Sequence, residues 1–366
     1  MNEHPENDPL YSGLKVNKGL SQPPNINPYL NRQRRERKKE LSVDEYVRGI
    51  RDGNITILSQ AVTLVESFKF DHQSTARKII EACLPYSGKS VRVGITGVPG
   101  AGKSTSIDTF GMHLIKQGKK LAVPAIDPSS ERSKGSILGD KTRMEQLARE
   151  KNAFIRPSPS AGSLGGVARK TRETIILCEA AGFDTVFVET VGVGQSETAV
   201  HSMVDFFLLI QLAGTGDELQ GIKRGIMEMA DGIVINKADG DNIEKANLAK
   251  AQFANALHLF PMPESGWLPK VLTYSGYYGT GIAEIWEMIY EFVAFARNNG
   301  YFQHHRHRQA KYWMFEAINE SLKSRFYNNE RVVAALVELE QKVLNAEISS
   351  FAAAQQLIEL HEKPPL

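Results

Sequence analysis

The chain has 366 residues and a formal net charge of +2, with 42% hydrophobic and 23% charged residues. This balance is typical of globular proteins and gives no global excess of positive charge for binding nucleic acid. The 2 cysteines, Cys83 and Cys178, lie far apart and form no C-x-x-C pair, which argues against a disulfide scaffold or a cysteine-rich metal site.

Nothing in the sequence indicates a membrane or a secreted protein. The longest apolar run, residues 206–210, is too short to cross a bilayer. The N-terminus carries acidic residues and no hydrophobic segment, so neither a secretory signal nor a transit peptide is expected. We therefore expect a cytoplasmic protein that contacts neither membrane nor nucleic acid.

The first 41 residues differ in composition from the rest. Residues 1–41 are rich in Pro, Asn and charged residues, which predicts a disordered arm. The basic run at residues 32–39 is interpreted as a solvated lead-in to a helix, with contact to an acidic partner as the alternative.

An N-terminal helical region is predicted over residues 42–88. Ser42 and Glu45 form an S-x-x-E capping box, so a helix should start there. A second helix has one apolar face, formed by Ile55, Leu58, Val62 and Val65. A third is predicted over residues 74–84, ending before a proline.

The most informative stretch is VRVGITGVPGAGKS at residues 91–104, a short strand pattern followed by G-x-x-x-x-G-K-S, the P-loop motif. Glycines let backbone N–H groups point at phosphate oxygens, and the next helix offers its positive N-terminal end. Lys103 can reach the β- and γ-phosphates, and the Ser104 hydroxyl can ligate Mg²⁺. The predicted phosphate-binding residues are Gly97, Gly100, Ala101, Gly102, Lys103, Ser104 and Thr105.

Strand-like and helix-like segments alternate after the P-loop, which predicts a mainly parallel sheet covered by helices on both faces. The further predicted strands are residues 121–126, 186–188, 206–212, 232–235 and 271–274. Each ends in polar or glycine-rich residues, and ligands of such sheets bind at the carboxyl ends of the strands. We therefore predict an α/β P-loop NTPase domain over residues 89–298.

An N-K-A-D sequence beginning at Asn236 directly follows one of these strands. Its carboxylate, Asp239, suits the N1 and 2-amino donors that guanine has and adenine lacks. We predict that Asn236, Lys237 and Asp239 read the base, and that Ser275 and Gly276, after the next strand, add backbone contacts to it. The expected bound nucleotide is GTP or GDP rather than ATP.

An E-T-V-G sequence begins at Glu189, where most P-loop GTPases carry D-x-x-G. In that motif the acid acts on Mg²⁺ through water, and the glycine, here Gly192, faces the γ-phosphate. The next residue is Val193 instead of the Gln that orients water in Ras-type enzymes, and Gln195 lies further on. We expect slow intrinsic hydrolysis, or hydrolysis completed by a partner.

Two further polar segments contain candidate residues. Asp127 follows a predicted strand and Asp140 comes thirteen residues later. Both are candidate carboxylates for the Mg²⁺ shell or for positioning water, and Arg143 is a candidate phosphate ligand; the alternative for Asp127 is that it only begins a turn. Residues 214–223 are either a surface loop or a third nucleotide-responsive switch.

The chain reads as helical from about residue 282 onward. A 4-3-4 apolar repeat is formed by Val332, Leu336, Leu339 and Val343. It indicates a core seam or a dimer seam, and we favour dimerisation, with residues 299–366 as a helical dimerisation region. His304, His305 and His307 are interpreted as a solvated basic helix start rather than a metal site.

Six motifs together, GVPGAGKST, DPSS, LGDKTRM, ETVGVGQSE, GTGDELQGIKRGIMEMAD and NKAD, make the chain similar to the MeaB/ArgK family of P-loop GTPases, which belongs to the SIMIBI class and is marked by E-x-x-G. The similarity covers about residues 42–310 and excludes the arm. It implies a homodimeric GTPase chaperone for an adenosylcobalamin-dependent acyl-CoA mutase, usually methylmalonyl-CoA mutase. Such a chaperone gates cofactor loading and protects or reactivates the mutase, and it meets adenosylcobalamin only through that partner.

The resemblance also implies roles for matching positions. Lys103 and Ser104 would bind phosphate and Mg²⁺, Asp127, Asp140 and Glu189 would form the acidic Mg²⁺ and hydrolysis shell, and Asn236 and Asp239 would read guanine. Residues 214–223 would report the nucleotide state to the mutase.

Other functions remain alternatives. A nickel-insertion GTPase would need Cys and His ligands near the nucleotide, and the two cysteines here are isolated. An ATPase or kinase linked to amino-acid transport conflicts with N-K-x-D. A GTP-binding scaffold that barely hydrolyses conflicts with the complete acidic set.

Overall fold

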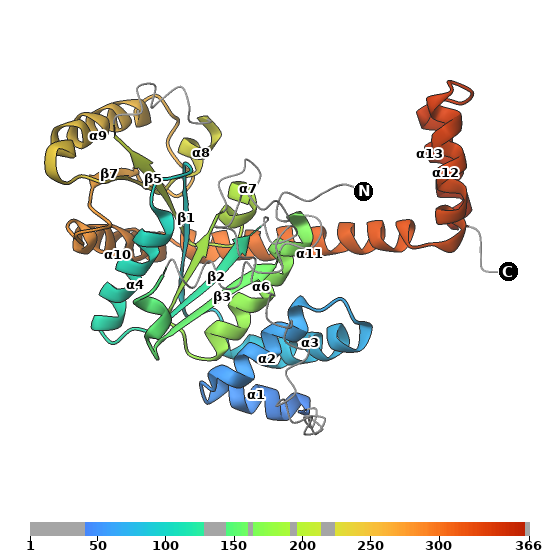
Figure 1. The fold of residues 1–366 in the computed structure, drawn as a ribbon, viewed down its shortest axis with the longest axis horizontal. Coiled ribbons are helices and arrows are strands. Elements are labelled where there is room, and N and C mark those ends of the chain that lie inside the picture. Colours follow the sequence, from blue (N-terminus) through green and yellow to red (C-terminus); the bar gives the residue numbers. More distant parts are fainter. Residues whose placement is uncertain (1–40, 128–143, 160–163, 191–195, 214–223, 363–366) are drawn as a thin grey trace, which may run out of the picture. The chain divides into compact units, whose positions relative to one another are not determined.

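The computed structural model describes residues 41–127, 144–159, 164–190, 196–213 and 224–362. Its centre is a sheet of 7 strands in the order β3-β2-β4-β1-β5-β6-β7, and every neighbouring pair is parallel (Figure 1). The strands are β1 (Val91–Gly97), β2 (Leu121–Asp127), β3 (Ala153–Pro159), β4 (Thr185–Glu189), β5 (Phe206–Leu212), β6 (Gly232–Asn236) and β7 (Lys270–Thr273). The predicted α/β P-loop fold is confirmed.

The sheet is buried on both sides because alternate residues of a strand point to opposite faces. On one face, Leu208, Ile210 and Val234 join a core with α4 (Lys103–Lys116) and α10 (Ile282–Asn298). On the other, Leu209, Ile233 and Ile235 pack with α8 (Arg224–Met229) and α9 (Ile243–Leu257). Two more helices are α6 (Leu164–Ala180), which contacts β2, and α7 (Ser196–His201), which contacts β1. The two helices also contact each other.

Strand β3 is absent from the sequence-based expectation. Its sequence, AFIRPSP, carries two prolines, which cannot donate to a sheet ladder. The structure places β3 at the edge of the sheet, where one side of the strand needs no partner strand. Proline is compatible with that position.

The predicted N-terminal helices are present as α1 (Val43–Arg51), α2 (Ile55–Glu66) and α3 (Phe70–Cys83). The capping box forms, since the Ser42 and Glu45 side chains each accept a hydrogen bond from the other's backbone N–H. Helix α3 begins earlier than expected and is followed by a short 3₁₀ turn, η2 (Leu84–Tyr86). All three helices contact α6 and so pack on the domain that carries the P-loop.

Three helices end the chain: α11 (Tyr301–Tyr327), α12 (Glu330–Leu344) and α13 (Ser350–Glu362). Val332 and Leu339 of the predicted seam are buried against Ala353 and Leu357 of α13. At least part of the seam is therefore a core contact between α12 and α13 of one chain.

The expectation of a solvated helix start at the histidine cluster is wrong for His305, which is 7% exposed. Its Nε2 lies 2.8 Å from the Gln309 Nε2 and 3.3 Å from the Val204 carbonyl oxygen. His304 and His307 are exposed, as expected.

The predicted arm, up to residue 40, lies outside the described residues. Among the helices of the described ranges, none combines the length and the apolar content that a bilayer crossing requires.

Candidate nucleotide-binding site

The P-loop connects the carboxyl end of β1 to the first turn of α4, with Gly102 in the left-handed region at φ +84°. Glycine is needed here because a Cβ on Gly102 would lie 2.7 Å from the Asn236 Nδ2. A Cβ on Gly97 would lie 2.3 Å from the Ile210 carbonyl oxygen, so β5 also excludes a side chain. The loop is thus packed against β5 and against the last residue of β6.

The Lys103 side chain folds back over the loop. Its Nζ donates to the Gly97 carbonyl oxygen at 2.9 Å and to the Val98 carbonyl oxygen at 3.4 Å. Burial lowers the pKa of Lys103, and the carboxylates of Glu189 and Glu197 act in the opposite direction. The ammonium is therefore held in a partly desolvated place that favours an incoming anion.

Ser104 and Glu189 meet beside this lysine. The Ser104 hydroxyl donates to the Glu189 Oε1 at 3.3 Å, because β4 pairs with β1 and brings Glu189 level with Ile95. The following Thr190 hydroxyl donates to the Thr96 Oγ1 at 2.8 Å, which fixes the start of the E-x-x-G segment. Two oxygen ligands of the kind that Mg²⁺ prefers thus lie side by side, and the residues present fit this ion.

Other predicted members of the acidic and phosphate-binding set are only partly visible. Asp127 is the last residue of β2, at the same sheet edge, since β2 pairs with β4 at Ala125 and Glu189. Asp140, Arg143 and Gly192 lie outside the described residues, as does the candidate switch at 214–223.

Asn236 connects three loops of the site. Its Nδ2 donates to the Ala101 carbonyl oxygen at 2.7 Å, and its Oδ1 accepts from the backbone N–H groups of Gly276 at 2.9 Å and of Lys237 at 2.7 Å. Lys237 has a φ of +61°, an uncommon value for a non-glycine residue. The N-K-A-D loop, the P-loop and the loop after β7 are therefore held as one unit.

Asp239 is also positioned by the loop after β7. The Ser275 hydroxyl donates to the Asp239 Oδ2 at 2.5 Å and accepts from the Tyr278 backbone N–H at 3.1 Å. Ser275 thus acts through its side chain, and the Gly276 N–H is already bonded to Asn236. The backbone contacts of Ser275 and Gly276 with the base, expected from the sequence, stay a prediction.

Sequence reasoning missed a second link between α4 and this loop. The Ser106 Oγ lies 2.6 Å from the Tyr274 hydroxyl, and the Thr109 hydroxyl donates to the Gly276 carbonyl oxygen at 2.6 Å. Ser106 and Thr109 are one helical turn apart, so a polar pair on an otherwise apolar helix face was the available signal. Both bonds steady the loop that orients Asp239.

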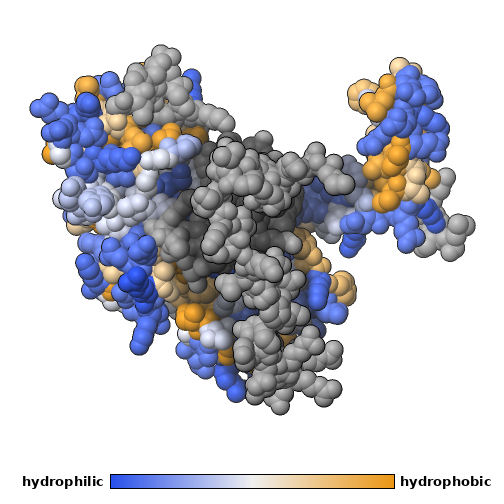
Figure 2. Space-filling model, viewed as in Figure 1, coloured by the Kyte–Doolittle hydropathy of each residue, from blue (hydrophilic) through white to orange (hydrophobic). Residues whose placement is uncertain are grey.

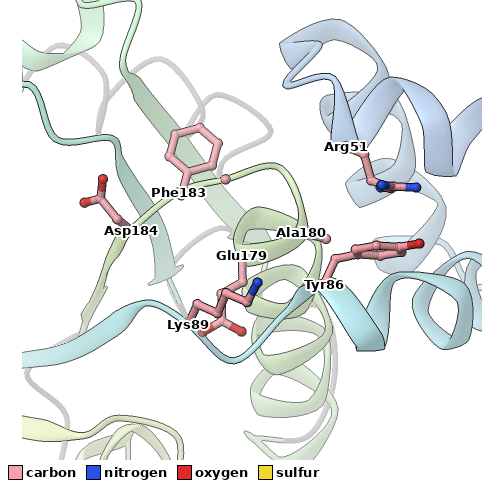
Figure 3. A pocket seen from close by; sticks show the side chains of 8 residues that line it. Arg51, Tyr86, Lys89, Glu179, Ala180, Phe183 and Asp184 are labelled. Carbon is pink, nitrogen blue, oxygen red and sulfur yellow. The ribbon is translucent and has the colours of Figure 1, made fainter.

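A separate cavity of about 380 Å³ lies away from this site (Figure 3). Its lining includes Lys89 and Asp184, which precede β1 and β4. The cavity therefore lies at the amino ends of these strands, whereas the P-loop lies at the carboxyl end of β1. The Arg51 guanidinium there lies over the Tyr86 ring at 3.9 Å from the centroid, and Glu179 is paired with Arg92. None of the predicted site residues lines this cavity. Within the described ranges, no cluster of His, Cys, Asp and Glu forms a metal site by itself.

Comparison with known proteins identifies relatives of this arrangement. The family model described as methylmalonyl Co-A mutase-associated GTPase MeaB matches residues 58–331. A probable GTPase of Mycobacterium tuberculosis is 48% identical over 319 residues, covering 87% of this chain and 95% of the relative. The mitochondrial methylmalonic aciduria type A homolog of Mus musculus is 44% identical over 331 residues, covering 88% and 80%.

A solved structure agrees with these matches. The crystal structure of a LAO/AO transport system kinase superposes with a TM-score of 0.70 at 40% identity, covering 88% of this chain and 98% of that one. On the family match, the two relatives and this structure, the chain is a P-loop GTPase and belongs to the MeaB family of methylmalonyl-CoA mutase-associated GTPases.

Proposed function

We propose that this GTPase is a chaperone of an adenosylcobalamin-dependent acyl-CoA mutase, with methylmalonyl-CoA mutase as the first client to test. The observation that carries the proposal is the match over residues 58–331 to a family described as associated with that mutase. A relative named for methylmalonic aciduria supports the same client. In this role GTP hydrolysis times the loading of adenosylcobalamin into the mutase and the mutase's protection or reactivation, and the GTPase meets the cofactor only through its partner.

The phosphates are proposed to bind where Lys103 now contacts the loop. Phosphate oxygens would replace the carbonyl oxygens of Gly97 and Val98 as acceptors for the Lys103 Nζ, and these charge-assisted bonds are stronger than those to neutral carbonyls. The backbone N–H groups of the P-loop and of Thr105 at the start of α4 would surround the same oxygens. Arg143 and Gly192 are proposed to meet the γ-phosphate.

Ser104 and Glu189, with Asp127 and Asp140, are proposed to hold Mg²⁺ directly or through water. The ion would supply charge neutralisation on the phosphate oxygens. The chain's own residues then orient the phosphoryl group and its attacking water, so that GTP and water give GDP and inorganic phosphate. Because Val193 follows Gly192, no Ras-type glutamine is available at that position, and we propose a slow intrinsic rate.

Guanine is proposed to bind between Asn236, Lys237 and Asp239. The Asp239 carboxylate would accept from the N1 and 2-amino groups of the base, and its bond to Ser275 fixes the orientation of the carboxylate beforehand. Asn236 would act by holding the loops around the base in place, since its Nδ2 and its Oδ1 are both hydrogen-bonded to loops of the site.

The C-terminal helices, within residues 299–366, are proposed to form a homodimer. An apolar groove of about 430 Å³ lies between α12 and α13, and Figure 2 shows apolar residues gathered along this pair. The groove is lined mainly by Leu336, Leu339, Val343, Leu344, Ala353 and Leu357. Next to it, Phe351 is 86% exposed. A second copy of the chain is the occupant that the family resemblance implies.

The test of the proposed function is GTP turnover by the full chain with and without purified methylmalonyl-CoA mutase, with ATP as the control nucleotide. We expect GTP-only activity that rises markedly when mutase is added. GTP-only activity that is indifferent to this mutase would leave a GTPase with a different client. Equal turnover of ATP would contradict the base-binding assignment and favour the transport-linked alternative.

A further inference from the structure

A buried carboxylate beside the P-loop has no role in the site described so far. Glu197 in α7 is 5% exposed. Its Oε2 is fully buried and has no hydrogen-bond partner within the described part of the chain. An unpaired buried carboxylate oxygen is costly, so a nearby charge is needed to balance it.

The packing of α7 shows which part of the fold Glu197 faces. Val200 lies directly over β1, because a Cβ on Gly94 would come within 3.0 Å of the Val200 Cγ1. Glu197 precedes Val200 by three residues and so shares its helix face, about 4.5 Å nearer the start of the helix.

The direction of α7 completes this placement. In the chain, α7 connects the parallel strands β4 and β5, so it runs antiparallel to them. The first residues of α7 therefore lie at the carboxyl ends of the strands. Glu197 therefore faces the end of β1, near Thr96 and Gly97. That is the point where the Lys103 ammonium rests on the Gly97 carbonyl oxygen.

Two carboxylates act on the Lys103 charge. Glu189 contacts Ser104 and has a role in the proposed Mg²⁺ shell. Glu197 has no such role, yet both carboxylates stabilise the charged form of Lys103 against its burial. Glu197 thus provides a negative charge close to the lysine that must turn toward the phosphates.

We propose that Glu197 is a positioning residue that acts as the counter-ion of Lys103 in the phosphate-free site and competes with nucleotide phosphates for it. The inference rests on the proposed phosphate-binding role of Lys103. A competing carboxylate weakens binding more strongly as the ligand carries more phosphate charge, so Glu197 lowers the affinity for GTP more than that for GDP. It leaves the affinity for guanosine unchanged.

The test is calorimetric binding of GTP, GDP and guanosine to the full chain and to Glu197→Gln, which keeps the side-chain shape and removes the charge. We expect GTP to bind about tenfold tighter, GDP to gain less, and guanosine to stay the same. A merely structural role would weaken all three ligands together. An unchanged or lowered ratio of GTP to GDP affinity would overturn the proposal.

Four further variants make the result decisive. Glu197→Asp keeps the charge and should keep the wild-type ratio of GTP to GDP affinity; a raised ratio in this variant would overturn the proposal. Glu179 is a buried carboxylate near the amino ends of the strands, away from the P-loop, so Glu179→Gln should leave the ratio unchanged. If Glu197→Gln fails to fold, Glu197→Ala is measured in the same way. Lys103→Ala separates the two hypotheses, because unchanged GTP affinity in that variant contradicts the phosphate-binding role itself.

Discussion

The Asn236 side chain donates a 2.7 Å hydrogen bond to the Ala101 carbonyl oxygen, so a residue of the N-K-A-D motif holds the main chain of the P-loop. Asn236 is 3% exposed, and its amide oxygen accepts from two further backbone N–H groups. The two halves of the nucleotide site are thus connected through a buried amide whose nitrogen and oxygen are both hydrogen-bonded. Such a group is expensive to disturb.

Replacing Asn236 by Asp should weaken both halves of the site. The carboxylate keeps the acceptor for Gly276 but sets a negative oxygen against the Ala101 carbonyl oxygen. Loss of this buried bond corresponds to about 1–3 kcal/mol, or roughly fivefold to 150-fold in GDP affinity, measured by calorimetry. Asn242→Ala is the matched control, since the Asn242 amide also donates to a carbonyl oxygen, that of Lys237, but is only half-buried. Equal losses in the two variants would contradict the linking role of Asn236.

Asp239→Asn should change the preferred base. The amide presents a donor where guanine also has one, whereas xanthine offers a carbonyl oxygen at that position. We expect affinity to move from GTP toward XTP, measured by competition against a fluorescent GDP analogue. Ser275→Ala is the companion variant: it frees Asp239 but leaves the carboxylate, so GTP should weaken without any gain for XTP. Retained GTP selectivity in Asp239→Asn would count against its role in reading the base.

The sequence was sufficient for the elements whose signal is local. The P-loop, the N-K-A-D loop and strand β5 occupy the residues where their patterns predict them, because glycine spacing and short apolar runs do not depend on distant partners. Strand β3 was missed because its prolines resemble a loop, and only the edge position in the sheet makes them tolerable.

Contacts between segments that are distant in the chain could not be predicted from local sequence patterns. His305 stands in a basic run, yet it is buried because α11 packs against the segment after α7, where its ring approaches the Val204 carbonyl oxygen. The bond from Asn236 to Ala101 spans 135 positions, and neither local motif specifies it. The seam on α12 had two interpretations because an apolar stripe does not identify what covers it.

Leu336→Asp should give monomers if the groove of α12 and α13 is the dimer surface. Leu336 lines that groove, and an aspartate there would have to be desolvated in the interface. Light scattering of the full chain measures the effect. Gln341→Asp, at an exposed position outside the groove lining, is the control and should leave the dimer intact. A dimer that persists in Leu336→Asp would locate the interface elsewhere.

Asp231 should make stability depend on pH. Removal from solvent raises the pKa of Asp231 to about 7, with a further increase from Asp205 and an opposing effect of the Phe207 N–H bond. The folded state therefore binds a proton more tightly than the unfolded chain, whose pKa is about 3.9. Stability from this group is fully present below pH about 4 and is lost as the pH rises through about 7.

Asp231→Asn should remove this dependence. Its amide oxygen can still accept from the Phe207 N–H and carries no charge, so the variant should gain stability relative to wild type between pH 5 and pH 8, by about 1–3 kcal/mol. Urea unfolding at the two pH values measures the difference. The exposed Asp241→Asn is the control and should show the wild-type slope. A slope in Asp231→Asn that equals that of wild type would show that another group is responsible.

Arg306→Ala should destabilise the protein far more than Arg308→Ala, although both remove an ion-paired arginine of α11. The Arg306 guanidinium contacts both Asp205 carboxylate oxygens at 2.7 Å, and these side chains are only 10% and 1% exposed. Its loss leaves a buried carboxylate with only the Arg92 backbone N–H among the described donors, at a cost of about 3–5 kcal/mol. Arg308 pairs with Glu264 at the surface, where both side chains are about half exposed, and its loss should cost about 0–1 kcal/mol. Urea unfolding of the two variants measures both values, and equal losses would mean that the Arg306 pair does not fasten α11 to the strands of the GTPase domain.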